Sequence, residues 1–411
     1  MIEYLNNEFT SSKISENIKN QIFKYVVEFG SFKVSDLVDK TGYSTTTILK
    51  YVKIMQENGF LIPMGKIGIN RKGRKSVEYG IKSNSYFFIG VDIKNFELNI
   101  AIMDFIGNIL LEKTYYDFVF ANDHQTLDNL CNHITDFINN LDNISSDNIS
   151  YICINISGRV NAKKGTSASI FNFEDTQDSP LSVILSERIG KNVCIENDTK
   201  SMAYGEYLSG LNKKYKNLLY VNISWGLGIG IIIYGNIYYG KDGYSGEFGH
   251  VQSYNNNIMC HCGKKGCLET EVSGNAIHRK LLERIKSGEA SILSKKVKEG
   301  SIIKLKDIIE AADKEDPLSI ELIEQTGTEL GHQLAGLINI FNPEAIIIGG
   351  ILSEADPNYF IKSTELAIKK YSLKLMSQNV KIISSELKDR AGVVGACFIA
   401  RAHLLNIDPK H

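Results

Sequence analysis

One short segment of the sequence has residue types and spacing that suit metal binding. Three of the seven cysteines fall within eight residues, and a histidine precedes them closely. Three thiolates and one imidazole make a complete tetrahedral ligand set for zinc. Because four protein ligands leave no position for substrate, such a site is structural rather than catalytic. The predicted ligands are His250, Cys260, Cys262 and Cys267.

Two features of this segment bear on how the ligands could meet. Gly263 and Gly266 allow the tight turn that would bring Cys262 and Cys267 onto one ion. His261 stays an alternative to His250, although its position between two ligands makes simultaneous coordination awkward. The other interpretation is three unrelated buried cysteines, and their density argues against it. The odd, clustered total also favours reduced thiols over a disulfide framework.

The metal segment lies within a long body of mixed strand and helix patterns. Glycines stand at several strand ends, as in α/β folds, where ligands bind beyond the strands. A helical stretch is expected over roughly 276–340. The main expected strands are Tyr86–Ile93, Glu97–Asp104, Ile109–Tyr115, Ile149–Ile156, Val193–Ile195, Leu218–Ile223, Gly230–Tyr234 and Ala345–Ile348.

A different pattern occupies the first 82 residues. Apolar residues recur at helical spacing over 14–29, and a second short helix fits 34–40. Gly42 then precedes a run of hydroxyl residues, 43–47, that can cap a third helix. A helix, a turn with glycine and a helix opened by small hydroxyl residues form the helix-turn-helix pattern, whose second helix enters the DNA major groove.

Two short strand patterns, 60–62 and 77–81, follow the third helix and enclose a cationic loop. Such a hairpin is typical of a wing, whose cations lie against phosphates. The alternative is a small helical domain with a solvated basic loop, which the order of the parts disfavours. The expected DNA contacts are Ser44, Thr45, Thr46, Thr47, Lys50, Arg71, Lys72, Arg74 and Lys75.

Composition and charge set the broad class. Residues 40–82 carry seven lysines and two arginines against two glutamates, whereas the whole chain has a net charge of −1. A basic module is thus joined to an acidic body. The chain is 43% hydrophobic and 23% charged, as expected for a globular protein. Because the sequence shows neither a membrane-spanning run of about 18 apolar residues nor a secretory signal, we expect a cytoplasmic protein without a membrane partner.

The segment from Gly246 to Glu269 resembles the signature of the ROK family of repressors, open reading frames and sugar kinases. That signature runs Glu-x-Gly-His and then Cys-x-Cys-Gly-x-x-Gly-Cys-x-Glu, and this sequence matches it throughout. The resemblance extends over residues 15–405 and includes similar motifs at 195–206, 226–230 and 342–350. With its basic N-terminal module, the chain is similar to the branch of xylose repressors and N-acetylglucosamine repressors.

The resemblance implies a fold and a domain organisation. The fold is an N-terminal winged helix-turn-helix followed by a two-lobed α/β body of the actin-like, ribonuclease H-like sugar-kinase type. We expect the DNA-binding domain at 1–82 and the first lobe at 83–205, completed by a C-terminal helix at 391–411. The second lobe, with the zinc loop, is expected at 206–390.

The resemblance also implies a sugar site. In the family, sugar is held by an Asn-Asp pair, by the Glu and His of Glu-x-Gly-His and by the Glu after the last cysteine. Carboxylates accept hydrogen bonds from sugar hydroxyls, an amide both donates and accepts, and the metal shapes the pocket by orienting its loop. Exposed surface charge is the weaker interpretation of the two glutamates. The implied contacts are Asn197, Asp198, Glu247, His250, Glu269 and, as a further contact, Asn172.

The phosphate side of the body departs from the family's kinases. Asp198 keeps the position of the kinase general base. The resembling kinases carry Asp-x-Gly-Gly-Thr after the first strand, whereas this sequence has Asp92-Ile93-Lys94-Asn95-Phe96, and Leu227 replaces a usual Thr in the second glycine-rich loop. Side chains at both glycine positions should obstruct phosphates. We therefore expect that the protein is not an enzyme and does not act as a sugar kinase.

The sequence thus predicts a sugar-responsive transcription regulator, a repressor by its resemblance, with structural zinc. It would bind operator DNA and a mono- or amino-sugar effector, and a homodimer or homotetramer would present paired modules to a pseudo-palindromic operator. The polar residues suit hexoses, N-acetylated hexosamines and pentoses alike. Two alternatives remain: an active ATP-dependent ROK sugar kinase with an appended DNA-binding domain, and a binding protein whose N-terminal domain contacts protein.

Overall fold

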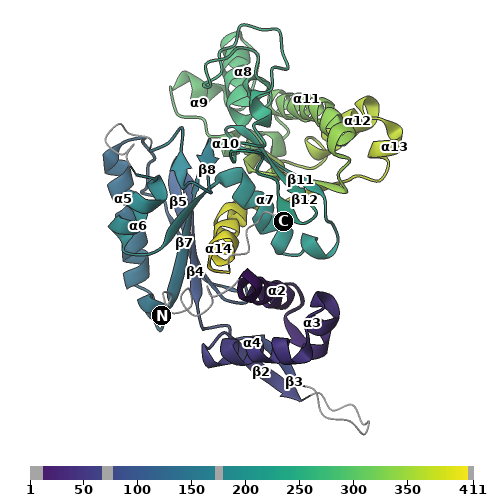
Figure 1. Ribbon diagram of the computed structural model, residues 1–411. Coiled ribbons are helices and arrows are strands. Elements are labelled where there is room, and N and C mark those ends of the chain that lie inside the picture. The colour runs from purple at the N-terminus through teal and green to yellow at the C-terminus, as the bar shows by residue number, and fades with distance from the viewer. Residues whose placement is uncertain (1–12, 67–76, 172–178, 406–411) are drawn as a thin grey trace. The chain divides into compact units, whose positions relative to one another are not determined.

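The computed structural model describes residues 13–66, 77–171 and 179–405 (Figure 1). They form two compact units. The first unit takes its described residues from 13–154, 181–194 and 397–405, and the second from 155–180 and 195–396. No helix in the described part of the chain is long and apolar enough to cross a membrane.

The first unit begins with a winged helix whose helices match the sequence pattern. Its elements are α2 (Lys13–Phe29), β1 (Ser31–Lys33), α3 (Val34–Thr41), α4 (Thr45–Glu57), β2 (Leu61–Lys66) and β3 (Val77–Ile81). The apolar stripes meet in a core that contains Ile22, Leu37 and Ile48, each fully buried. Strand β1 was not predicted, because three residues are too few to show an alternating pattern. It pairs with β3, which gives the sheet order β1-β3-β2.

A five-stranded sheet follows in the first unit, with the order β10-β7-β4-β5-β6. The strands are β4 (Phe87–Lys94), β5 (Glu97–Asp104), β6 (Ile109–Tyr115), β7 (Ile149–Ile156) and β10 (Val193–Asn197). Nearly every residue of β4, β5 and β7 is buried, which explains their continuous apolar runs. Helices α5 (His124–Asn139) and α6 (Leu181–Ile189) lie side by side over one face of the sheet (Figure 1).

The second unit has its own five-stranded sheet, with the order β13-β12-β11-β14-β15. Its strands are β11 (Leu218–Ile223), β12 (Leu227–Ile233), β13 (Asn236–Ile237), β14 (Ala345–Gly349) and β15 (Lys381–Ser384). The predicted helical stretch consists of four helices, α8 (Gly274–Lys286), α9 (Ser294–Lys298), α10 (Leu305–Asp313) and α11 (Pro317–Phe341). Other helices of this unit are α7 (Asp198–Leu208), α12 (Ile361–Tyr371) and α13 (Lys374–Ser377). A core of buried aliphatic residues, among them Val221, Ile277, Leu330 and Ile348, joins these helices to the sheet.

Strand β12 begins at Leu227, earlier than the predicted Gly230, so the second glycine-rich segment is largely strand. Gly228 and Gly230 pack against α7. An added Cβ at Gly228 would lie 2.6 Å from Thr199 Oγ1, and one at Gly230 would lie 2.4 Å from Ala203 Cβ. Glycine weakens a strand pattern, which explains the late prediction. These glycines serve helix–strand packing.

Candidate functional site

His250 and the three clustered cysteines meet in the second unit. His250 Nδ1 lies 3.5 Å from Cys260 Sγ, and Cys262 Sγ lies 3.6 Å from Cys267 Sγ. All four donor atoms lie within 4.8 Å of one another. Zinc–nitrogen and zinc–sulfur bonds of about 2.0–2.3 Å place the ligand atoms of a tetrahedral site about 3.5–3.8 Å apart. The donor set and its spacing are therefore compatible with a zinc ion.

The geometry distinguishes the two histidines. His261 has 72% of its side chain exposed, and its Nδ1 lies 3.0 Å from Glu269 Oε1. His250 is mostly buried, and burial lowers its pKa. A lowered pKa favours the neutral imidazole that a metal ion requires. Of the two, His250 is the better placed fourth ligand.

Local backbone geometry explains how the cysteines converge. Gly263 and Gly266 have φ values of 84° and 73°, in the left-handed region. A Cβ on Gly266 would lie 2.0 Å from the carbonyl oxygen of Tyr254, so only glycine fits there. The Tyr254 hydroxyl in turn donates to Glu329 Oε2 of α11 at 2.8 Å. The metal loop is thus fixed to the helical layer of its unit.

Asn197 and Asp198 lie where β10 runs directly into α7. Asn197 Oδ1 caps the helix by accepting from the backbone N–H of Lys200 at 3.0 Å, and its Nδ2 donates to the Gly158 carbonyl at 3.0 Å. Asp198 Oδ2 accepts from the Ser157 hydroxyl at 2.7 Å. Burial raises the pKa of the Asp198 carboxyl, and the Ser157 hydrogen bond opposes that rise. The pair is therefore held rigidly before any ligand binds.

Glu247 and His250 form the second part of the predicted sugar site. Glu247 Oε2 lies 3.7 Å from His250 Nε2 and 3.6 Å from Arg159 Nε. The imidazole thus directs Nδ1 toward the cysteines and Nε2 toward Glu247. A metal ion bound to Nδ1 would fix the ring and, through it, the side that faces Glu247.

Glu269 connects the metal loop to the glycine-rich strand. It follows the fully buried Cys267 by two residues, and its Oε2 accepts from the Leu227 backbone N–H at 3.0 Å. A Cβ on Gly226 would lie 2.8 Å from the same carboxylate oxygen. The position of Glu269 therefore depends both on the metal loop and on the start of β12.

Sequence reasoning missed three polar residues of this site. Ser157 and Arg159 contact Asp198 and Glu247, respectively. Lys200 is 4% exposed and interacts electrostatically with Glu196, Glu247 and Asp198, while burial lowers its pKa. Ser157 and Arg159 directly follow the strand predicted to end at Ile156. Because ligands bind beyond strand ends in α/β folds, that position could have pointed to both residues. Asn172 falls outside the described residues, and its role stays a prediction.

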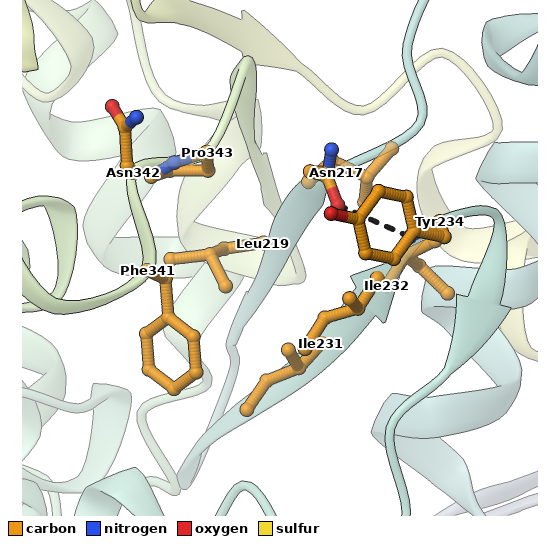
Figure 2. A pocket seen from close by; sticks show the side chains of 10 residues that line it. Asn217, Leu219, Ile231, Ile232, Tyr234, Phe341, Asn342 and Pro343 are labelled. Atoms are coloured by element: carbon orange, nitrogen blue, oxygen red, sulfur yellow. Dashed lines mark hydrogen bonds between the residues drawn. The ribbon is translucent and has the colours of Figure 1, made fainter.

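A cavity of about 290 Å³ lies elsewhere in the second unit (Figure 2). Leu219, Ile231 and Phe341 line it together with the amides of Asn217 and Asn342, and Tyr234 stands at its side. Among the described residues, no predicted sugar contact lines it. The described residues of the predicted sugar site lie instead around Asp198 and Glu247.

The segment that would be a phosphate loop in a kinase is a β-hairpin. Strands β4 and β5 pair up to Lys94 and Glu97, and Lys94 Nζ lies 2.7 Å from Glu97 Oε1. Phe96, at the turn, is 58% exposed. The Lys94 charge is thus already paired within the hairpin, in the first unit.

Helix α4 has the features expected of a recognition helix. Gly42 ends α3 with φ 72°, and the Ser44 side chain caps α4 by accepting from the Thr47 backbone N–H at 3.2 Å. Thr45, Thr46 and Lys50 are exposed on the helix, whereas Thr47 is partly buried. The predicted wing contacts fall within 67–76, outside the described residues, and stay predictions: Arg71, Lys72, Arg74 and Lys75.

Replacing Lys50 by alanine is expected to weaken DNA binding about tenfold. An exposed lysine on a recognition helix neutralises a phosphate or reads a base, and loss of one phosphate contact lowers the salt slope of log K by about 0.9. Fluorescence anisotropy over a salt series measures both quantities. Lys214→Ala removes an exposed lysine of the second unit and should change neither. An unchanged affinity and slope in Lys50→Ala would exclude Lys50 from the interface.

Comparison with known proteins gives matches over most of the chain. Residues 88–403 match the model of the ROK family. The chain is 27% identical to the DNA-binding transcriptional dual regulator NagC of Escherichia coli strain K12 over 391 residues, 95% of this chain and 94% of that protein.

Two solved structures are also similar. A ROK family transcriptional regulator, a homologue of the E. coli Mlc protein, superposes with a TM-score of 0.81 at 27% identity, covering 97% of this chain and 99% of that one. A ROK family glucokinase from Streptomyces griseus, in complex with glucose and AMPPNP, gives a TM-score of 0.65 at 27% identity, covering 77% of this chain and 99% of that one.

Proposed function

Because this chain belongs to the ROK family, we propose that it is a sugar-responsive transcription regulator. Its winged helix binds operator DNA, and its second unit binds a mono- or amino-sugar effector. The observation that carries this proposal is the N-terminal module. The regulators match 95% and 97% of the chain, whereas the glucokinase matches 77%, and the family model begins at residue 88, after the winged helix.

The site geometry supports assigned roles for the polar residues. Carboxylates and an amide fixed by backbone and hydroxyl contacts can exchange hydrogen bonds with several sugar hydroxyls. The histidine–cysteine cluster holds a structural zinc ion, which supplies rigidity to the loop that carries the remaining contacts. The proposed sugar contacts are Asn197, Asp198, Glu247, His250 and Glu269, and the proposed zinc ligands are His250, Cys260, Cys262 and Cys267.

A thermal-shift screen tests the sugar half of the proposal. A ligand that binds only the folded state raises its stability by mass action. Glucose, xylose and N-acetylglucosamine are each added to the purified protein, with and without ATP and magnesium. We expect one sugar to raise the Tm and ATP to have no effect of its own. If no sugar raises the Tm, the effector assignment fails.

The second candidate function is an active sugar kinase, because Asp198 keeps the position of a general base. We expect any sugar-dependent ATP turnover rate to lie at least about 1000-fold below the 1–100 s⁻¹ that is typical of kinases. Phosphoryl transfer needs a cradle of amides and positive charge, whereas Lys94 is paired with Glu97, and Gly228 packs against Thr199. A coupled ADP assay with a ROK glucokinase as positive control measures this. Turnover within the usual range would establish the kinase instead.

A further inference from the structure

Five aromatic rings join the winged helix to the sheet of the first unit. We define this aromatic junction as Phe23, Phe60, Tyr86, Phe88 and Phe105. The Phe105 ring is central: its centroid lies 5.9 Å from that of Phe23, 6.1 Å from those of Phe60 and Tyr86, and 5.7 Å from that of Phe88. All five side chains are buried. These separations and ring tilts are typical of attractive aromatic pairs.

The backbone between the two parts is also held. The Lys82 N–H donates to the Phe60 carbonyl at 3.0 Å, and the Phe105 N–H donates to the Ser83 carbonyl at 2.9 Å. The segment from Lys82 to Tyr86 therefore bonds to the winged helix on one side and to the β5–β6 turn on the other. These two hydrogen bonds hold the segment more firmly than an unbonded linker would be held.

Helix α14 (Ala391–Leu404) reaches the junction through Arg401. Arg401 is 4% exposed, its Nη1 donates to the Phe105 carbonyl at 3.1 Å, and its guanidinium lies 5.0 Å from the Phe398 ring centroid. A buried guanidinium is costly unless it is hydrogen-bonded, so this contact fixes the end of α14 to the junction.

The beginning of α14 packs against α7, the helix that Asp198 opens. A Cβ on Gly395 would lie 1.9 Å from the Ser201 carbonyl oxygen, and one on Gly205 would lie 2.7 Å from the Ala391 carbonyl oxygen. The Asn155 amide also donates to the Gly392 carbonyl at 2.8 Å. The two helices therefore lie in close contact, with no room for a methyl group between them.

We propose that α14 and the aromatic junction transmit effector binding from α7 to the DNA-binding module. The inference rests on the proposed function. Sugar bound at Asp198 shifts α7, α14 moves with it as a rigid helix, and Arg401 carries the movement to Phe105. Because packed interiors move between discrete arrangements rather than deforming smoothly, the winged helix then turns together with the first sheet.

Two variants test this path. Phe105→Leu removes the central ring, and Arg401→Met removes the donor while keeping an apolar stem. DNA affinity is measured by anisotropy, on a duplex selected from a random library by the unaltered protein, with and without glucose, xylose or N-acetylglucosamine. In the unaltered protein one sugar should change DNA affinity at least about fivefold. In both variants that factor should fall below about twofold, while sugar affinity and sugar-free DNA affinity stay within about threefold.

Phe32→Leu is the matched control, because Phe32 is a buried aromatic of the winged helix that contacts Tyr79 and Tyr25. It should keep the full sugar effect. If Phe105→Leu does not fold, Arg401→Met tests the path alone. Amide hydrogen exchange of α4 is then the second readout. Sugar should alter that exchange in the unaltered protein but not in Arg401→Met. If sugar changes the DNA affinity of Arg401→Met by the same factor as in the unaltered protein, the proposed path through α14 is overturned. A lack of any sugar effect in the unaltered protein would instead refute the proposed function.

Discussion

Replacing Cys267 by serine is expected to abolish zinc binding and to weaken sugar affinity about 10- to 100-fold. Cys267 is fully buried, and Glu269, two residues later, accepts a hydrogen bond from the Leu227 N–H. Without its fourth ligand the loop loses the ion that fixes it, so Glu269 and His250 lose their orientation toward the sugar. Contacts that orient a metal site commonly change affinity or activity by this factor. Elemental analysis measures zinc, and isothermal titration measures sugar affinity.

Cys131→Ser is the matched control for this variant. Cys131 is a buried cysteine of α5 in the first unit, outside the cluster, so the same chemical change should leave zinc and sugar affinity unaltered. Treating the unaltered protein with a strong chelator should reproduce the Cys267→Ser result. Undiminished sugar affinity in zinc-free protein would show that the metal loop does not support the sugar site.

Replacing Asp198 by asparagine is expected to weaken sugar affinity about 10- to 100-fold and to leave zinc bound. The carboxylate accepts from Ser157 on Oδ2 and from the Thr199 N–H on Oδ1, which orients it. Hydrogen bonds to a charged group contribute about 1.5–3 kcal/mol, and an amide supplies one weaker acceptor. Titration calorimetry measures sugar affinity. The fluorescence of the half-buried Trp225, the single tryptophan of the chain, offers a second readout during a sugar titration.

Asp123→Asn is the control for this second variant. Asp123 caps α5 by accepting from the Thr126 N–H at 2.7 Å, and asparagine caps helices about as well as aspartate. Sugar affinity should therefore be unchanged. Because Asp198→Asn should keep its zinc, it separates loss of a sugar contact from loss of the metal loop. Unchanged sugar affinity in Asp198→Asn would remove Asp198 from the sugar site.

The metal cluster and the winged helix could be predicted because their signals are local in the sequence. Three ligands lie within eight residues, and Gly263 and Gly266 mark the turn between them. In the winged helix, the hydroxyl run after Gly42 predicted the cap that Ser44 provides. Local spacing fixes such features before tertiary packing contributes.

The contacts that orient the site could not be predicted in the same way. Ser157 is 41 residues from Asp198 in sequence, and nothing in the pattern relates the two. The strand that was expected from Gly230 begins at Leu227, and close packing of Gly228 and Gly230 against α7 accompanies this earlier start. The contact between Arg401 and Phe105 spans 296 residues. Tertiary contacts, and not local propensity, decide these features.

If the proposed function is correct, this chain binds both operator DNA and a sugar, and the two binding events are coupled. The most direct measurement is the anisotropy of a selected duplex titrated with the protein at fixed salt, without sugar and with the sugar found by thermal shift. We predict that sugar changes the DNA affinity at least about fivefold. Coupled sites typically change each other's affinity about 5- to 150-fold. Unchanged DNA affinity under saturating sugar would refute the proposed function, and sugar-dependent ATP turnover beside it would favour the kinase.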